Sequence, residues 1–152
     1  MKTVTVLVCF CLLLVSSSAA KQFNVGDIWK DCSKSGDAVK INSVTISPEQ
    51  PEKGETVSVE AVITVQNNTM ITGGKINVTA SLDNVPLLEK IFDLCSESSI
   101  IGVNCPLTSG QRTLSAKPTI TDLAPPGNYT ILAIIEDQNK QEVLCIKADF
   151  KL

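Results

Sequence analysis

The chain has 152 residues, a length that suits a single domain, with a formal net charge of −3 and no histidine. Its mild negative charge offers no basic footprint for nucleic acid and no polybasic segment for strong adhesion to anionic membranes. The lack of histidine excludes Ser-His-Asp and Cys-His catalytic arrangements, and it removes the imidazole ligand from any metal site.

The first twenty residues have the pattern of a secretory signal peptide. Lys2 gives a positive start, Val4 to Val15 are apolar without interruption, and Ser16 to Ala20 are small residues that suit a cleavage site. The apolar run is shorter than the roughly 20 residues that span a bilayer, although an uncleaved anchor is the alternative. We therefore predict a signal peptide over residues 1–20 and a mature domain over residues 21–152 that is secreted or delivered to the endolysosomal lumen.

Alternating apolar and polar residues predict β-strands along the mature chain, and no stretch has a convincing helical period. Clusters of proline, glycine, asparagine and aspartate separate the alternating segments and are typical of turns. Seven short strands with regular turns favour an all-β fold, an antiparallel two-sheet sandwich of immunoglobulin-like architecture. The expected strands are Ile41–Ser47, Thr56–Val65, Lys75–Leu82, Leu87–Leu94, Arg112–Thr121, Asn128–Glu136 and Glu142–Lys151.

Four of the six cysteines remain after the predicted signal peptide, and an even number in an oxidising compartment indicates two disulfides. Four cysteines allow three pairings. Cys95 and Cys105 flank one connection, so a local bridge between them is the simplest pairing and leaves Cys32 for Cys145. A bond between Cys32 and Cys95 would contradict this assignment.

Three Asn-X-Thr triplets predict N-glycosylation at Asn67, Asn77 and Asn128, with chance occurrence as the alternative. Asn77 falls on the polar face of its expected strand, and Asn67 falls in an expected turn. We therefore expect both of these side chains to be exposed.

The sequence gives little support to catalysis. Glu136 and Asp137 are the nearest candidates for the carboxylate pair of a glycosidase, but adjacent acids at a hairpin turn are better explained as solvated surface groups. Gly73, Gly74 and Gly127 are turn residues rather than parts of a phosphate-binding loop. We predict that the protein is not an enzyme, has no catalytic residue, and uses neither a metal nor another cofactor.

The expected inward faces consist of valine, isoleucine, leucine and alanine. Such side chains either close a sandwich into a dry core or line a cleft between two sheets. The loop from Ser96 to Asn104 contains Ile100, Ile101 and Val103, although a connection of this kind is usually polar. These apolar residues indicate either a plug on the core or an apolar rim around an opening.

Several local sequences, in order along nearly the whole mature chain, resemble the ML lipid-recognition family. They are Trp29–Cys32, Ile46–Gly54, Cys95 with Cys105-Pro106-Leu107 and Gly110, Pro126–Tyr129, Glu136–Asp137 and Val143–Cys145. Within the family the chain is most similar to secreted phosphatidylglycerol/phosphatidylinositol transfer proteins. The related lysosomal cholesterol-binding proteins of the Niemann–Pick type carry a third disulfide in the segment after the first cysteine, where this chain has none.

The resemblance implies a sandwich whose sheets separate to hold the apolar part of one lipid, without chemistry. Since each buried methylene contributes about 0.8 kcal/mol, an apolar cavity alone can hold a two-chain lipid. By this analogy the acyl chains lie against Val59, Ile63, Val78, Leu82, Ile131, Ala133, Leu144 and Ile146. The mouth of the cavity is expected at Phe92, Leu94, Ile100, Ile101, Val103 and Pro106.

The leading interpretation is a monomeric, secreted lipid-binding protein. It would carry a phospholipid, phosphatidylglycerol or phosphatidylinositol, between membranes through transient contact with their surfaces. Two alternatives remain: a sterol carrier with the same fold, and a solid-core secreted module for recognition.

Overall fold

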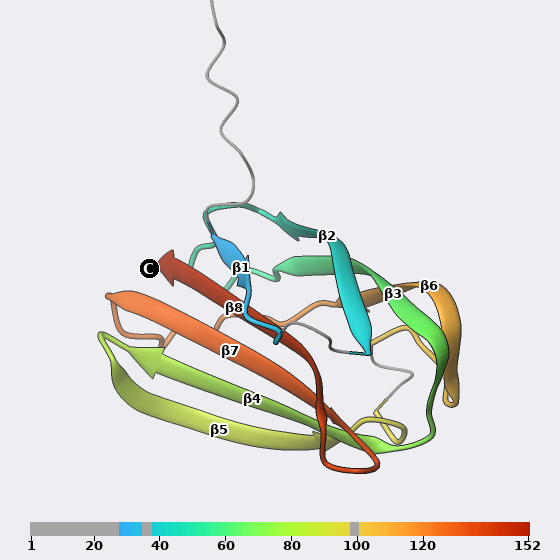
Figure 1. Cartoon of the computed structure of the whole chain (residues 1–152). Helices are drawn as coiled ribbons and strands as arrows, with labels where there is room; N and C mark the ends of the chain where they lie inside the picture. The colour runs from blue at the N-terminus through green and yellow to red at the C-terminus, as the bar shows by residue number, and fades with distance from the viewer. Residues whose placement is uncertain (1–27, 35–37, 98–100) are drawn as a thin grey trace, which may run out of the picture.

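The computed structural model describes residues 28–34, 38–97 and 101–152 (Figure 1). The predicted signal peptide lies outside these residues, and so does Ile100 of the predicted mouth. The described part of the chain forms eight β-strands. None of its segments is a helix of the length and apolar character needed to cross a membrane.

The strands form two antiparallel sheets packed as a sandwich, which confirms the predicted fold class (Figure 1). The larger sheet has the strand order β1-β8-β7-β4-β5, and the smaller sheet has the order β2-β3-β6. The strand bounds are β1 Trp29–Asp31, β2 Val39–Ser47, β3 Ser58–Ile71, β4 Gly74–Leu82, β5 Val85–Asp93, β6 Leu107–Ala116, β7 Asn128–Asp137 and β8 Glu142–Lys151.

The expected strands agree with these bounds except in three places, the first of which is β3, whose strand was expected to end at Val65 but continues to Ile71. The short β1 was not predicted, and the strand expected at Arg112–Thr121 instead begins at Leu107 and ends at Ala116. Pairing with β3 determines these limits, because the ladder runs from Leu107 opposite Ile71 to Ala116 opposite Val59. Pro118 follows closely, and proline has no N–H to continue a ladder.

The register places apolar residues of neighbouring strands on the same face of each sheet. Ala133 of β7 pairs with Val78 of β4 and with Ile146 of β8, and directly paired residues of antiparallel strands share a face. In the smaller sheet, Ala61 of β3 pairs with Val44 and Leu114 in the same way. Each sheet therefore turns one aliphatic face toward the other.

A two-residue turn joins β4 to β5. Asp83 and Asn84 have φ angles of 47° and 66°, and Leu82 pairs with Val85 across the turn. Two successive residues with positive φ form the type of turn that matches the twist of a hairpin, and asparagine and aspartate tolerate this conformation. The turn brings β5 to the free edge of the larger sheet.

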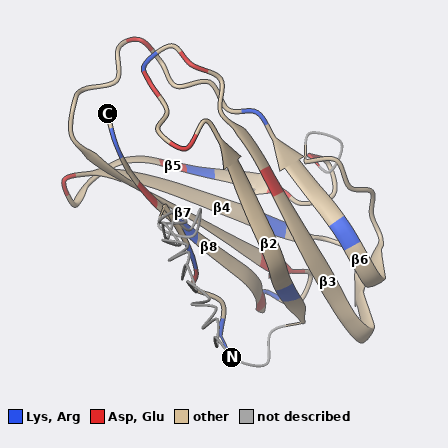
Figure 2. Ribbon diagram, turned by 90° about the horizontal axis from the view of Figure 1, so that it is seen from above, with Lys and Arg blue, Asp and Glu red and all other residues tan. Residues whose placement is uncertain are grey.

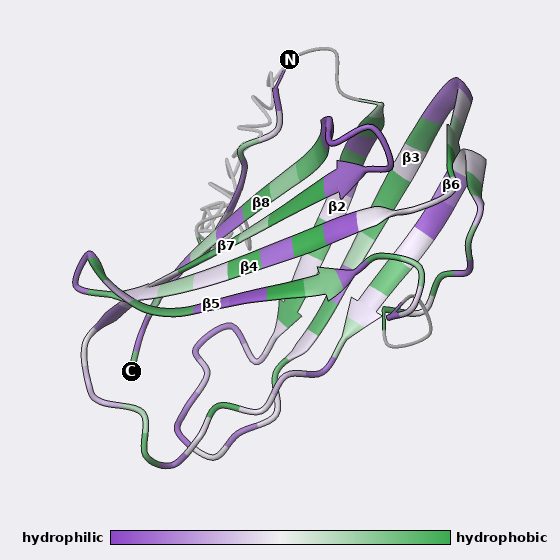
Figure 3. Cartoon of the chain, turned by 90° about the horizontal axis from the view of Figure 1, so that it is seen from below, coloured by the Kyte–Doolittle hydropathy of each residue, from purple (hydrophilic) through white to green (hydrophobic). Residues whose placement is uncertain are grey.

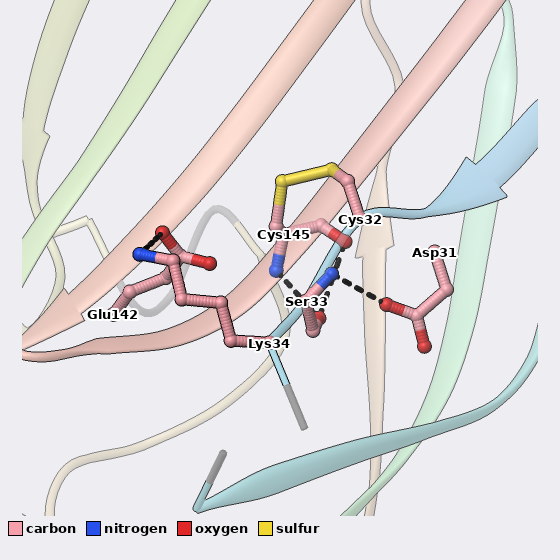
Figure 4. Close-up of a disulfide and its surroundings, with 6 residues drawn as sticks. All are labelled: Asp31, Cys32, Ser33, Lys34, Glu142 and Cys145. Atoms are coloured by element: carbon pink, nitrogen blue, oxygen red, sulfur yellow. Dashed lines mark hydrogen bonds and ion pairs between the residues drawn. A yellow bond between two sulfur atoms is a disulfide. The ribbon is translucent and has the colours of Figure 1, made fainter. Parts of the chain in front are cut away.

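A disulfide between Cys32 and Cys145 joins the segment after β1 to β8 (Figure 4). Beside it, the Cys145 N–H donates to the Ser33 hydroxyl at 2.8 Å, and the Ser33 N–H donates to Asp31 at 2.9 Å. The ammonium of Lys34 lies 3.1 Å from Glu142. The second disulfide joins Cys95 to Cys105. The N-terminal segment is thus held to the edge of the larger sheet by a covalent bond and a local polar network.

Candidate functional site

The space between the two sheets is lined by aliphatic side chains and divides into two regions. In the first, which we call the packed half, the side chains of both sheets interdigitate around Ile71, Leu94, Leu144 and Val65, the largest fully buried residues of the described chain. Its remaining interior cavity has a volume of about 10 Å³. The lining residues of this cavity are Val39, Ile63, Ile71, Leu94, Ile101, Val103, Leu107, Leu114, Ile135, Val143 and Leu144. Such a volume holds at most about one water molecule and no part of a lipid chain.

In the second region, the inward face of the larger sheet is less well covered. Its residues share a face by register but are only half-buried, and we call this surface the open face. It consists of Val78 and Ala80, Leu82, Ile131, Ala133, Ile146, Ala148 and Phe150. On the smaller sheet, Ile46, Val59 and Ala116 are also inward and half-buried. The sandwich therefore leaves part of its apolar interior accessible to solvent.

Two aromatic residues stack on each other at the end of the open face where β7 begins and β8 ends. Tyr129 stacks on Phe150 with ring centroids 5.5 Å apart, and its hydroxyl donates to the Pro125 carbonyl at 2.7 Å. Tyr129 is buried while Phe150 is half-buried. Both the ring stack and the hydrogen bond restrain the tyrosine at this end of the open face.

The residues expected to contact acyl chains are divided between the two regions. Six of them, Val59, Val78, Leu82, Ile131, Ala133 and Ile146, are inward and half-buried, and Val59, Val78 and Ile146 among these also pack against the edge of the core. Ile63 and Leu144 instead belong to the buried core. The sequence analysis did not select Ala80, Ala148 and Phe150, although the alternation of β4 and β8 carried the signal that would have identified them.

The residues expected at the mouth do not form an open rim. Val103 and Leu94 are buried in the core, and Ile101 packs against it with its carbonyl accepting the Ser115 N–H at 2.9 Å. The disulfide and this hydrogen bond hold the loop along β6, so its apolar side chains act as a plug on the packed half. This geometry favours the plug over the rim for the described part of the loop.

The remaining two residues of the expected mouth lie at the ends of this loop. Phe92 is half-buried with the Lys90 ammonium 4.7 Å from its ring centroid, whereas Pro106 is exposed. Neither side chain lines the small interior cavity. They mark the surface on either side of the plug.

The three sequon asparagines have different surroundings. Asn67 is exposed, as expected, but it lies within β3, at a register irregularity rather than in a turn. Asn77 is half-buried because it pairs with Ile91 and Ile134, and its amide donates to Glu89 at 3.2 Å. The expectation that Asn77 is exposed is therefore wrong. Asn128 is exposed, and its amide donates to Asp83 at 2.9 Å.

In the described part of the chain, acidic and basic residues occur along both the strands and the turns (Figure 2). Asp137, a member of the acidic pair considered for catalysis, accepts the backbone N–H groups of Asn139 and Gln141 at 2.8 and 3.0 Å. Burial raises the pKa of Asp137, but these hydrogen bonds outweigh it and hold the pKa below its usual value. Asp137 thus closes the β7–β8 turn. Within the described residues, no three histidine, cysteine, aspartate or glutamate side chains gather in a group that suits a metal ion.

Several known proteins resemble the chain over most of its length. A Dictyostelium discoideum protein provisionally named a phosphatidylglycerol/phosphatidylinositol transfer protein is 34% identical over an alignment of 152 residues, which covers 93% of this chain and 95% of that protein. The phosphatidylglycerol/phosphatidylinositol transfer protein of Neurospora crassa is 27% identical over an alignment that covers 74% of this chain and 63% of that protein.

Two solved structures resemble the fold. A Niemann-Pick type C2 protein from the Japanese carpenter ant has a TM-score of 0.62 at 17% identity, covering 82% of this chain and 98% of that one. Chicken MD-1 in complex with lipid IVa has a TM-score of 0.50 at 15% identity, covering 81% of this chain and 87% of that one. The family model of the ML domain matches residues 26–152. This chain therefore belongs to the ML domain family.

Proposed function

We propose that this protein is a lipid-binding protein that carries one phospholipid between membranes, with the acyl chains on the open face, and that it acts without catalysis. The accessible aliphatic surface inside the sandwich is the observation that carries the proposal. The names of its relatives, which describe phosphatidylglycerol/phosphatidylinositol transfer, suggest the class of lipid. The distant structural neighbour MD-1 was solved in complex with lipid IVa, which supports lipid binding by a protein of this fold.

The physical chemistry of the open face supports this function. Apolar surface of this kind is normally buried in a protein of this size, and its exposure costs about 25 cal/mol for each Å². A lipid chain laid on the open face would recover that free energy. The binding volume of a lipid is several hundred Å³, whereas the interior cavity has about 10 Å³. Binding therefore requires the sheets to move apart, with the open face as the place where separation begins.

The same proposal includes the setting in which the protein acts. Two disulfides suit a secreted protein or one in the endolysosomal lumen, because the cytosol keeps thiols reduced. We expect a monomer whose signal peptide is residues 1–20 and whose mature domain is residues 21–152. Among the sequons, exposure favours glycosylation at Asn67 and Asn128 over the half-buried Asn77.

Native mass spectrometry with lipid extraction, performed on the disulfide-intact protein, tests the proposal. We expect one phospholipid per chain, together with transfer of labelled phosphatidylglycerol or phosphatidylinositol between vesicles. Ile131→Asp, which places a charge on the open face, should abolish uptake. Leu132→Asp is the matched control, because the next side chain along β7 points to the opposite face.

The alternatives give different results in this experiment. One sterol per chain would replace the phospholipid assignment with a sterol carrier. A protein that contains no lipid and takes up none from vesicles would indicate a solid-core recognition module. Equal uptake by the Ile131→Asp and Leu132→Asp variants would show that the lipid does not occupy the open face.

A further inference from the structure

Most of the exposed large hydrophobic side chains of the described chain lie on one strand, β5. Val85, Leu87, Leu88 and Ile91 are 61, 52, 56 and 57% exposed, respectively. The strand forms the free edge of the larger sheet and carries hydrophobic segments on both sides of its central charged pair (Figure 3). A cluster of this kind on one edge differs from the isolated apolar residues that are normal on protein surfaces.

Both faces of β5 carry exposed apolar side chains. Leu88 pairs with Ala80 and therefore points inward, whereas Ile91 pairs with Asn77 and points outward. The five-stranded sheet faces a sheet of three strands, so its edge extends beyond its partner. Among the inward residues of β5, Leu88 is exposed, whereas Phe92 packs against the core.

The exposed edge is continuous with the open face. The register places Leu88 in one row with Ala80, Ile131 and Ala148 across four strands. An open hollow of about 480 Å³ lies where β4 and β5 shift register. Its lining combines apolar residues, Ala80, Pro86, Leu87 and Leu88, with the polar residues Thr79, Ser81 and Glu89. A lipid chain that slides off the open face toward this side thus meets apolar side chains all the way to the edge.

The charged residues of β5 already have partners within the protein. Lys90 lies over the ring of Phe92, Glu89 accepts a hydrogen bond from Asn77, and Asp93 accepts the N–H groups of Cys95 and Ser96. The side chains of the strand that remain uncommitted are the apolar ones. With two acids and one base, the strand has no electrostatic reason to select an anionic surface.

Pairing of β5 with a second copy of the chain is disfavoured by the strand itself. Pro86 has no N–H to offer at the edge, and the ladder shifts register between Ala80 and Ser81. Proline, irregular register and charged side chains are the features by which edge strands avoid self-association. The occupant that suits the edge is therefore an apolar layer rather than another strand.

We propose that β5 is the membrane-docking edge of this protein, which inserts Val85, Leu87, Leu88 and Ile91 into the interfacial layer of a bilayer and so connects the open face to the membrane. This inference rests on the proposed lipid-carrying function. At interfacial depth, headgroups and water can satisfy the free backbone groups of the edge while the side chains contact acyl chains. Contact driven by apolar area does not depend on anionic lipid or on salt.

Vesicle flotation with phosphatidylcholine vesicles tests docking directly, on the disulfide-intact protein. The variant combines Leu87→Asp with Ile91→Asp, and both positions lie outside the open face. The matched control combines Met70→Asp with Leu123→Asp, which adds the same charge at residues that are 57 and 89% exposed away from β5. We expect at least about tenfold weaker vesicle binding for the β5 variant and wild-type binding for the control.

Lipid content measured by native mass spectrometry separates docking from lipid binding. A β5 variant that retains a lipid but floats poorly and transfers slowly supports the proposal. Wild-type flotation by that variant, equal losses in the control, or a wild-type protein that does not bind vesicles would each overturn it. A concentration-dependent dimer that the β5 variant abolishes would assign the edge to a second copy instead. A wild-type protein that floats but never holds lipid would contradict the proposed function alone.

Discussion

Leu144 and Ile131 lie on neighbouring strands and both face the space between the sheets, but their surroundings differ. Leu144 is 2% exposed and belongs to the core, whereas Ile131 is half-buried on the open face. The free energy lost on truncation depends on how many neighbours surround the side chain and on the cavity that remains. Stability and binding should therefore separate between these two positions.

Leu144→Ala should lower the free energy of unfolding by about 2–5 kcal/mol, because it leaves a cavity in a tightly packed region. Ile131→Ala should cost less than about 2 kcal/mol but weaken lipid retention, since it removes contact area from the open face. Urea unfolding and native mass spectrometry of both variants check the pair. The reverse order of stability losses would contradict the division of the interior into a packed half and an open face.

Asp149 shows how one hydrogen bond sets the behaviour of a carboxyl group in acid. The Thr130 hydroxyl donates to Asp149 at 2.6 Å, and Lys147 lies 3.2 Å away. The Thr130 hydrogen bond is the main cause that lowers the pKa of Asp149 below 3.8, while burial acts against it. A lowered pKa in the folded state means that this contribution to stability is present above the unfolded value and is lost as the pH falls through the folded value.

Thr130→Val should raise the pKa of Asp149 toward its ordinary value, because the variant lacks the hydroxyl donor. It should also reduce the dependence of stability on pH in the acid range. Thr130→Ser is the control, since serine retains the hydroxyl and the Asn-X-Ser/Thr sequon at Asn128. An NMR titration of the Asp149 carboxyl checks the shift, and an unchanged pKa in Thr130→Val would rule out this hydrogen bond as the cause.

The two disulfides act on elements of different kinds. The bond between Cys32 and Cys145 joins residues 113 apart in sequence and fixes β1 beside β8. The bond between Cys95 and Cys105 joins residues 10 apart and closes the loop whose side chains plug the packed half. Closing a long loop removes more conformational entropy from the unfolded chain than closing a short one.

On the chain-entropy estimate, replacing both Cys32 and Cys145 by serine should lower the free energy of unfolding by nearly about 5 kcal/mol. The same replacement of Cys95 and Cys105 should lower it by roughly 3 kcal/mol. The smaller bridge should have the larger effect on lipid exchange, because its loop covers the packed half. Chemical unfolding of the two double variants gives the stabilities, and vesicle transfer gives the exchange rates. If removal of the Cys95–Cys105 bond lowered the free energy of unfolding more than removal of the Cys32–Cys145 bond, the native contacts of the short loop would contribute more to stability than chain entropy does.

Sequence alternation predicted most of the strands because a half-buried sheet requires apolar residues at every second position. It located β6 five residues too late, since the strand limits depend on its partner β3, which lies about fifty residues away in sequence. It missed β1, whose three residues are too few to show a period. The exposure of Leu87 and Ile91 on β5 was equally hidden, because β5 is an edge strand only through the order in which the strands pair, which a local pattern does not show.

The candidate site was predictable to the same extent. Alternation identified inward residues such as Val78 and Ala133, but it could not divide them between a packed half and an open face. The apolar loop was correctly recognised as unusual, yet the choice between plug and rim required the hydrogen bond from Ser115 to Ile101 and the burial of Val103. Long-range packing, rather than local pattern, decided these points.

The sandwich as a whole combines a five-stranded sheet with a three-stranded one, and this inequality links stability to binding. Where the smaller sheet covers the larger, the interior is packed around a residual cavity of about 10 Å³. Where cover ends, the open face and β5 remain accessible. Because a lipid needs several hundred Å³, we expect loading to increase the separation of the sheets at the expense of contacts between them.

Filling the open face should therefore block loading while leaving the fold intact. Ala133→Phe adds an aromatic ring to the central strand of the open face, beside Val78 and Ile146, so the free energy of unfolding should fall by no more than about 1–3 kcal/mol. Lipid uptake should fall at least about tenfold, because the ring takes the place of an acyl chain. Leu132→Phe, on the opposite face of the same strand, should take up lipid as the wild type does.

Hydrogen exchange adds a second measurement. If the sheets separate, addition of lipid should increase amide exchange in β3 and β6 of the wild type and should leave exchange in Ala133→Phe unchanged. Full uptake by Ala133→Phe would place the lipid elsewhere, and a loaded wild type without altered exchange would mean that binding needs no separation of the sheets.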